Sequence, residues 1–330
     1  MNDLILGSLV VLLVVAEPLV GQQVPTPDFE PILGQPAFAQ GTGPLILVDE
    51  GHNNFHTLSP TTIPDATHVG FISIPGRLTS FRRLMLADGF RVEPLTEPFS
   101  ASALARASIL MISNALADEN VDDWGLPNLP AFDREEIEAV VAWVRAGGSL
   151  LLIADHQPWP AAAADLASEL GFVLYNGYAG SGGRPTDRDL FARTEGTLGD
   201  HVIVRGRSPA ESVSSVMTFG GQAFRALPGT DADPLLIFPS GSQIVLLADP
   251  FAPEPPPAET ITIPIDGMLQ GAVRTLGRGR VAVFGEAAMF TAQVVGPDRM
   301  PMGMNHPDAT DNAQFVLSLF HWLAGVLPAL

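Results

Sequence analysis

Short apolar runs alternate with helix-like stretches through the first half of the chain. Runs dominated by Leu, Ile and Val at residues 45–48, 108–113 and 149–154 predict buried strands. Shorter strands are predicted at 91–95 and, late in the chain, at 280–284. Strands of this composition, separated by amphipathic helices, are typical of a mostly parallel sheet covered on both faces. The pattern therefore predicts an α/β fold.

The helices between these strands carry start and stop signals. A helix is predicted at 79–88, with Gly89 as its stop. The strongest signal is Asp133, followed three positions later by Glu136, which is the spacing of a capping box. Further helices are predicted at 100–107, 161–170 and 308–326.

The second half of the chain is less regular. Residues 176–230 are rich in Gly, Ser and Arg, and the apolar runs at 235–238 and 244–247 predict a hairpin. The stretch 250–264 contains PEPPP, which does not fit the centre of a sheet. We therefore expect an irregular, β-containing insertion at about residues 176–265.

The N-terminal residues indicate export. The run LILGSLVVLLVV at 4–15 has the length of a signal-peptide core and is short for a membrane span. We expect a signal peptide at 1–21, a linker rich in Pro, Gln and Gly at 22–43, and one α/β domain at 44–330. The protein would then be periplasmic or extracellular, and would reach the membrane only through an uncleaved N-terminal segment.

Composition narrows the classes of function. Of 330 residues, 46% are hydrophobic and 16% are charged, which is enough to fill a large core. The 36 acidic and 17 basic residues give a net charge of −19, so nucleic acid is not an expected partner. The absence of cysteine excludes disulfides, thiolate metal ligands and a cysteine nucleophile.

Polar side chains gather where the predicted strands end. The carboxyl ends of parallel strands face one edge of a sheet, and ligands bind at that edge. We therefore expect these side chains to share one pocket. They are Asp49, Glu50, His52, Asn53, Asn54 and His56 after the first strand, and Asn114, Asp155, His156 and Glu286 after three others.

Two chemistries fit this set. A divalent metal such as zinc would be held by His52, His156 and Glu286, and would lower the pKa of a bound water towards about 7. Without a metal, His156 would be the general base, and Asp155, Asp49 or Glu286 its acid or orienting partner. The remaining residues would contact the ligand: Glu50, Asn53, Asn54, His56 and Asn114.

A structural reading of the same residues stays open. Asp and His after a strand often cap the next helix or hydrogen-bond a loop, and Asn53 and Asn54 fit a turn equally well. Histidines outside the set are assigned no chemistry. His68 and His201 are predicted to face solvent, and His321 to be packed in the closing helix.

Several segments in order resemble a known superfamily. DEGHNNFHT, FRRLMLADGFRVEPL, WVRAGGSLLLIADHQPWP, GRVAVFGEAAMFTAQ and NAQFVLSLFHWL are similar to uncharacterised exported bacterial proteins of the class I glutamine amidotransferase-like superfamily. Trehalose-utilisation-type and gliding-motility-transporter-type proteins are related branches. The resemblance covers most of residues 44–175 and 275–326, and implies a flavodoxin-like three-layer sandwich.

This chain departs from the superfamily at the catalytic elbow. Amidotransferases place a nucleophilic cysteine there, whereas this sequence has Asp155 and His156 at the comparable strand end. The thiolate route to glutamine hydrolysis is therefore excluded, and no catalytic residue is carried over. The resemblance supports the fold and the place of the pocket only.

The sequence leaves two functions to compare. The first is hydrolytic or binding chemistry on a small, carbohydrate-like ligand, and the second is a non-catalytic ligand-binding or interaction domain of an envelope complex. An enzyme predicts His156 and a carboxylate within hydrogen-bond reach in an open pocket. A scaffold for a complex predicts a large exposed apolar patch instead.

Overall fold

The computed structural model describes most of the predicted α/β domain and parts of the segment before it. The described residues are 23–26, 29–30, 34–58, 76–181, 188–248, 250 and 260–329. The predicted signal peptide and His68 lie outside them. Within these ranges, no helix is both long and apolar enough to cross a membrane.

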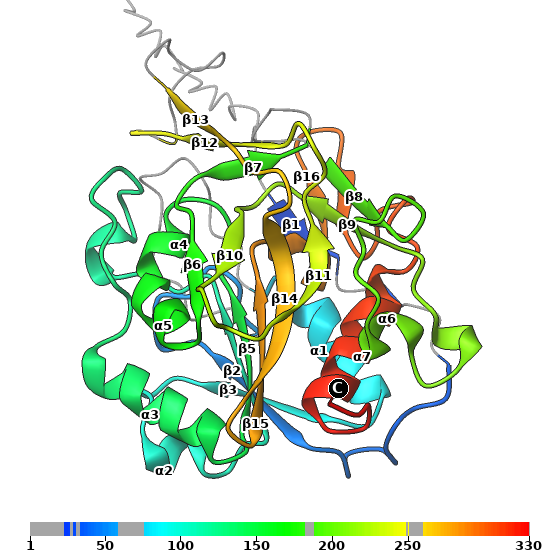
Figure 1. The fold of residues 1–330 in the computed structure, drawn as a ribbon. Coiled ribbons are helices and arrows are strands. Elements are labelled where there is room, and N and C mark those ends of the chain that lie inside the picture. The colour runs from blue at the N-terminus through cyan, green and yellow to red at the C-terminus, as the bar shows by residue number, and fades with distance from the viewer. Residues whose placement is uncertain are drawn as a thin grey trace, which may run out of the picture.

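A nine-stranded mixed sheet forms the centre of the molecule (Figure 1). Its parallel half has the order β3 (Arg91–Leu95), β2 (Leu45–Asp49), β4 (Ile109–Ser113), β5 (Ser149–Ile153) and β15 (Gly279–Phe284). The other half is antiparallel and begins where β14 pairs with β15. It contains β14 (Leu269–Leu276), β11 (Asp233–Ile237), β10 (Phe224–Ala226) and β6 (Phe172–Leu174). The predicted α/β class is confirmed, but the sheet is mixed because its parallel part stops at β15.

Helices lie against both faces of the sheet (Figure 1). One face carries α1 and α7, and the other carries α2, α3 and α5. The helices are α1 (Thr79–Ala87), α2 (Ala101–Leu104), α3 (Arg134–Arg145), α4 (Trp159–Ala162), α5 (Ala164–Glu169), α6 (Val202–Arg205) and α7 (Asn312–Leu323).

Side chains of the central strands contribute to two hydrophobic cores, one on each face of the sheet. In β2, Ile46 and Val48 belong to the core beneath α1 and α7, whereas Leu45 and Leu47 belong to the core beneath α2, α3 and α5. This follows from the two-residue period of a strand. The continuous apolar runs in the sequence therefore reflect burial on both faces.

The local signals for α1 and α3 hold in the structure. Asp133 Oδ1 accepts the backbone N–H of Glu136 at 2.8 Å, and Glu136 Oε2 accepts that of Asp133 at 3.2 Å. These reciprocal bonds are the predicted capping box. Gly89, after α1, has a φ of 90°, which a residue with a side chain rarely adopts.

The described residues also form three smaller sheets. The predicted hairpin is wrong, because β11 pairs with β14 whereas β12 pairs with β7 and β13. An apolar run indicates a buried strand but does not identify its partner. The small sheets are β7 (Tyr178–Gly180), β12 (Gln243–Leu246) and β13 (Ile261–Pro264); β8 (Arg188–Ala192) and β9 (Ser215–Phe219); and β1 (Gln23–Pro25), β16 (Ala292–Val295) and β17 (Met300–Gly303).

Buried hydrogen bonds of Asp88 join distant parts of the chain at the end of α1. Asp88 Oδ2 lies 2.6 Å from Nε2 of His321 in α7, and Asp88 Oδ1 accepts the backbone N–H of Ala37 at 2.9 Å. His321 is buried, as predicted. The prediction for His201 is wrong, because this side chain is 2% exposed and accepts the backbone N–H of Ile203.

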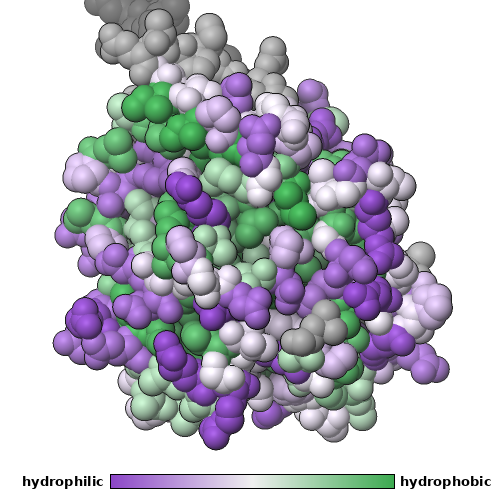
Figure 2. All heavy atoms as spheres, viewed as in Figure 1, coloured by the Kyte–Doolittle hydropathy of each residue, from purple (hydrophilic) through white to green (hydrophobic). Residues whose placement is uncertain are grey.

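Exposed apolar side chains are spread over separate elements. On the face seen in Figure 2, hydrophobic areas are interrupted by hydrophilic ones. The exposed large hydrophobic residues include Leu86 in α1, Leu190 in β8, Ile261 in β13 and Met300 in β17.

Candidate functional site

His52, just beyond β2, is held by two carboxylates. Its Nδ1 lies 2.8 Å from Asp49 Oδ1, and its Nε2 lies 2.9 Å from Glu136 Oε1. Burial lowers the pKa of His52, but the hydrogen bonds and charges of Asp49 and Glu136 raise it to about 9. His52 is therefore an imidazolium at neutral pH. A metal ion at His52 would have to displace one of these carboxylates.

Further hydrogen bonds hold His52, Asp49 and Glu136 in place. Asn54 Nδ2 donates to Asp49 Oδ2 at 2.9 Å, and Asn54 Oδ1 accepts the backbone N–H of His52 at 3.1 Å. Glu136 also accepts the backbone N–H of Phe99 at 2.9 Å. The loop after β2 is thus fixed to the first turn of α3. The sequence marked Glu136 as a capping residue only, with no signal that it would reach His52.

Asn114 joins the ends of two neighbouring strands. Its Oδ1 accepts the backbone N–H of Asp155 at 3.0 Å, so its Nδ2 donates to Nδ1 of His56 at 3.1 Å. His56 therefore carries its hydrogen on Nε2. Burial, followed by the charges of Arg77 and His156, lowers the pKa of His56 well below its usual value. His56 is a neutral hydrogen-bond donor at this site.

Two buried acids lie at the ends of β5 and β15. Asp155 accepts backbone N–H groups from His156 at 2.8 Å and Ala287 at 3.1 Å. Glu286 accepts two from the 3-10 helix η4 (Ala288–Phe290), at 2.6 and 2.9 Å. Burial raises the pKa of both groups, and the charge of Asp155 raises that of Glu286 further.

His156 has a different environment from His52. Its Nδ1 lies 2.7 Å from the carbonyl oxygen of Gln157 and donates to it, so Nε2 is the nitrogen that can exchange a proton. The ring stacks on Tyr178, with centroids 4.4 Å apart, and contacts Trp159 at 4.7 Å. Within the described part of the chain, neither ring nitrogen of His156 bonds to a carboxylate, so the His156–carboxylate contact expected of an enzyme is not formed.

The two remaining ligand-binding candidates have structural partners. Glu50 Oε1 accepts the backbone N–H of Leu58 at 2.5 Å. Asn53 has a φ of 48° and donates from Nδ2 to Asp118 Oδ1 at 2.8 Å. Of the predicted set, the structure brings His56, Asn114 and Asp155 together, with His156 and Glu286 as electrostatic neighbours. Asp49, His52 and Asn54 belong to the separate hydrogen-bond network that includes Glu136.

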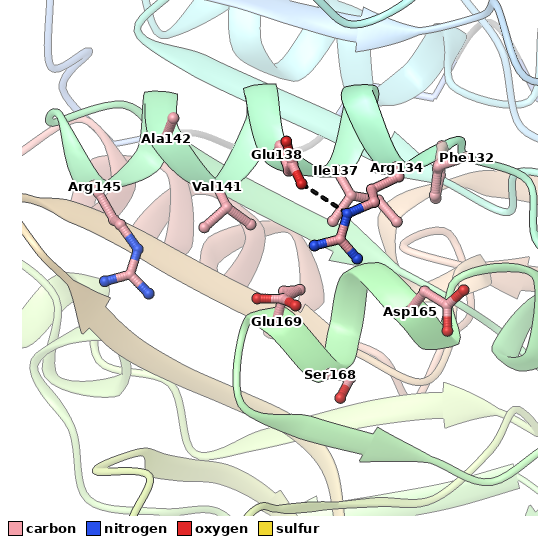
Figure 3. A pocket seen from close by; sticks show the side chains of 10 residues that line it. All are labelled: Phe132, Arg134, Ile137, Glu138, Val141, Ala142, Arg145, Asp165, Ser168 and Glu169. Atoms are coloured by element: carbon pink, nitrogen blue, oxygen red, sulfur yellow. Dashed lines mark hydrogen bonds and ion pairs between the residues drawn. The ribbon is translucent and has the colours of Figure 1, made fainter.

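A polar cavity of about 210 Å³ lies at this edge of the sheet. It is lined by Gly51, His52 and Asn53 on one side and by residues 116–119 and 130–131 on the other. A larger cavity of about 590 Å³ runs between α3 and α5, where Ile137 and Val141 approach Asp165 and Glu169 (Figure 3). No residue of the predicted set lines the larger cavity.

The predicted zinc ligands belong to separate hydrogen-bond networks. His52 is bound to Asp49 and Glu136, whereas Glu286 accepts backbone N–H groups of its own turn. Among the described residues, no three His, Asp or Glu side chains are grouped so as to hold a metal ion.

Comparison with known proteins gives a likeness in structure alone. No protein-family model matches the chain. No curated protein matches it either. The mmIFT52 N-terminal domain is similar in structure, with a TM-score of 0.53 and 12% identity over 84% of this chain and 97% of that one. At this identity the likeness shows a shared fold and nothing further.

Two more solved structures are similar at lower scores. A ThuA-like protein from Bacteroides uniformis has a TM-score of 0.47 and 12% identity over 89% of this chain and 97% of that one. A cytoplasmic protein from Salmonella typhimurium LT2 has a TM-score of 0.45 and 14% identity over 84% and 99%.

Proposed function

We propose that this chain binds a small, carbohydrate-like ligand at the ends of β4, β5 and β15, and that His156 exchanges a proton with it in a hydrolytic reaction. The observation that carries the proposal is the state of the His156 ring. Nδ1 is fixed by the carbonyl of Gln157, so Nε2 is the nitrogen that can exchange a proton. An imidazole oriented in this way can take a proton from water and return it.

The residues around His156 offer two acids and an aromatic surface for such a reaction. Asp155 and Glu286 are acids whose pKa is raised by burial, which is the direction expected of a group that donates a proton. Tyr178 and Trp159 flank the imidazole with aromatic surface. Aromatic walls with a few polar groups are typical of small-molecule sites, and they suit the C–H faces of a sugar.

A His156→Gln variant tests this role. We expect it to abolish hydrolysis of p-nitrophenyl glycosides and to weaken the binding of trehalose or other glucose disaccharides, measured by calorimetry. The control is His306→Gln, because His306 lies elsewhere and contacts Arg188. Equal turnover and binding in the wild type and His156→Gln would remove His156 from the reaction.

A zinc-dependent version of the same hydrolytic reaction is a second form of the proposal. His156 could ligate through Nε2 as it stands, but His52 and Glu286 would have to exchange present hydrogen bonds for the metal. Elemental analysis of the purified protein decides this. A stoichiometric metal that is lost in His156→Gln supports the zinc form, and a metal-free, active protein ends it.

A non-catalytic binding or interaction domain is the alternative function. It is favoured by the bonding of Asp49, His52 and Glu286, whose polar atoms are used within the fold. A ligand that binds the wild type and is never turned over would support it.

Export is also part of the proposal, and rests on the apolar run at residues 4–15. Expression of the full chain with a C-terminal tag, followed by mass spectrometry of the periplasmic fraction, should recover a product cleaved near residue 21. Only uncleaved protein in the cytoplasm would contradict it.

A further inference from the structure

Arg77 is a buried cation that has no carboxylate partner among the described residues. It lies just before α1 and is 1% exposed. Its Nη1 donates to the carbonyl oxygen of Phe55 at 3.1 Å, and its guanidinium lies 4.1 Å from the centroid of the Phe55 ring. Its buried Nε has no hydrogen-bond partner. In the described ranges, no Asp or Glu pairs with it, in a chain with 36 acidic residues.

The Arg77 guanidinium makes fewer hydrogen bonds than its donors allow. Arginine has five N–H donors in a planar fork, and a buried arginine is normally paired. Burial lowers the pKa of Arg77 to about 9, and no carboxylate acts against this effect. The guanidinium therefore remains charged at neutral pH. A buried, charged and incompletely bonded fork has the chemistry of a binding group for an anion.

The neighbours of Arg77 add to the positive character of this place. Arg77 and His156 are both close enough to His56 to lower its pKa. His56 presents an N–H at Nε2, because its Nδ1 accepts from Asn114. The N-cap residue of α1, Leu78, makes no side-chain cap bond, so the capping residue itself does not neutralise the positive end of the helix dipole.

We propose that Arg77, together with His56 and the start of α1, binds the oxyanion of an anionic ligand, so that the ligand is a sugar acid or sugar phosphate. This inference rests on the proposed function for the position and general class of the ligand. A carboxylate or phosphate would accept the fork of Arg77 in two parallel bonds, while the rest of the ligand extends towards His156.

Calorimetry with matched probes tests the inference. Glucose, glucuronate, glucose 6-phosphate and inorganic phosphate are titrated into the full protein and into Arg77→Gln, Arg77→Lys and Arg82→Gln. In the wild type we expect glucuronate or glucose 6-phosphate to bind at least about ten-fold more tightly than glucose, which is the size of effect that one charge-assisted pair gives. Which of the two binds tighter distinguishes a carboxylate from a phosphate.

The variants separate a binding role from a structural one. Arg77→Gln should reduce the preference for anions to less than about two-fold, and Arg77→Lys should keep part of it, because lysine retains the charge without the fork. Arg82→Gln, an exposed position on the same helix, should bind like the wild type. The melting temperature of Arg77→Gln without ligand should equal or exceed that of the wild type, because an unpaired buried charge is removed.

Four results would overturn the inference. They are equal binding of glucose and the anions, no binding of any anion, an anion preference unchanged in Arg77→Gln, or a large loss of stability in both Arg77 variants. The proposed function fails separately. If anions bind through Arg77 while His156→Gln changes neither binding nor turnover, the anion site stands and the role of His156 does not.

Discussion

His52 and His156 both follow a strand of the sheet, yet their surroundings give them opposite chemistry. His52 has a carboxylate on each ring nitrogen, whereas His156 has a carbonyl on one nitrogen only. Residue type and position after a strand are the same in the two cases. The difference arises from Asp49, at the end of β2, and from Glu136, which belongs to a helix far along the chain.

The charge on His52 makes folding depend on pH. Its folded pKa of about 9 lies above the usual 6.5, so its stabilisation is complete below pH 6.5 and is lost as pH rises through 9. We expect the free energy of unfolding, from urea melts, to fall by about 3 kcal/mol between pH 6 and pH 10. Glu286 acts in the same direction, because its pKa is also raised.

His52→Gln separates these contributions. It should remove most of the fall in stability above pH 6.5 while leaving any change below it. A pH profile identical to that of the wild type would show that His52 is not charged in the fold.

The sequence predicted the candidate site in part. The rule that parallel strands end at one edge placed His56, Asn114 and Asp155 near one another. Arg77 and Glu136 were not expected there, because a buried cation before a helix and a capping glutamate carry no sequence signal of their tertiary contacts.

Elements were most predictable where both faces of a strand are buried. β2, β4 and β5 are apolar at nearly every position, since each faces a core on both sides. The antiparallel half was less predictable. Its strands meet partners distant in sequence, and the pairing of β11 with β14 depends on contacts that hydrophobic pattern does not encode.

Truncation in the central strands should be costly. Ile109→Ala and Leu151→Ala, both at 0% exposure, are expected to destabilise the fold by about 2–5 kcal/mol through lost burial and the cavity left behind. Leu190→Ala, at a side chain 51% exposed, should cost less than about 0.5 kcal/mol. Urea melts of the three variants measure this, and similar losses in all would argue against a double-sided core.

The capping box of α3 should contribute less to the free energy of unfolding than the central strands do. Asp133→Ala removes the bond to the backbone N–H of Glu136 and is expected to cost about 1 kcal/mol. Glu135→Gln, exposed in the same turn, should cost only a few tenths through the helix dipole. Thermal melts compare the pair, and equal effects would mean that the cap does not support the helix.

At the scale of the whole molecule, Asp88 fixes the end of α1 to both α7 and the segment around Ala37. Asp88→Ala leaves His321 Nε2 and the backbone N–H of Ala37 without their acceptor and should cost about 1–3 kcal/mol. Glu138→Ala breaks the exposed pair with Arg134 and should cost less than about 1 kcal/mol. Denaturant melts test the contrast, which would disappear if the buried pair contributed nothing.

The position of β15 also governs the order in which the central sheet can be completed. β5 ends at Ile153, but its neighbour in the sheet is supplied by Gly279–Phe284, more than a hundred residues further along the chain. A partly folded chain that has paired β3, β2, β4 and β5 presents a bare hydrophobic strand edge to any other chain nearby. Self-association of partly folded chains is therefore expected at the edge of β5.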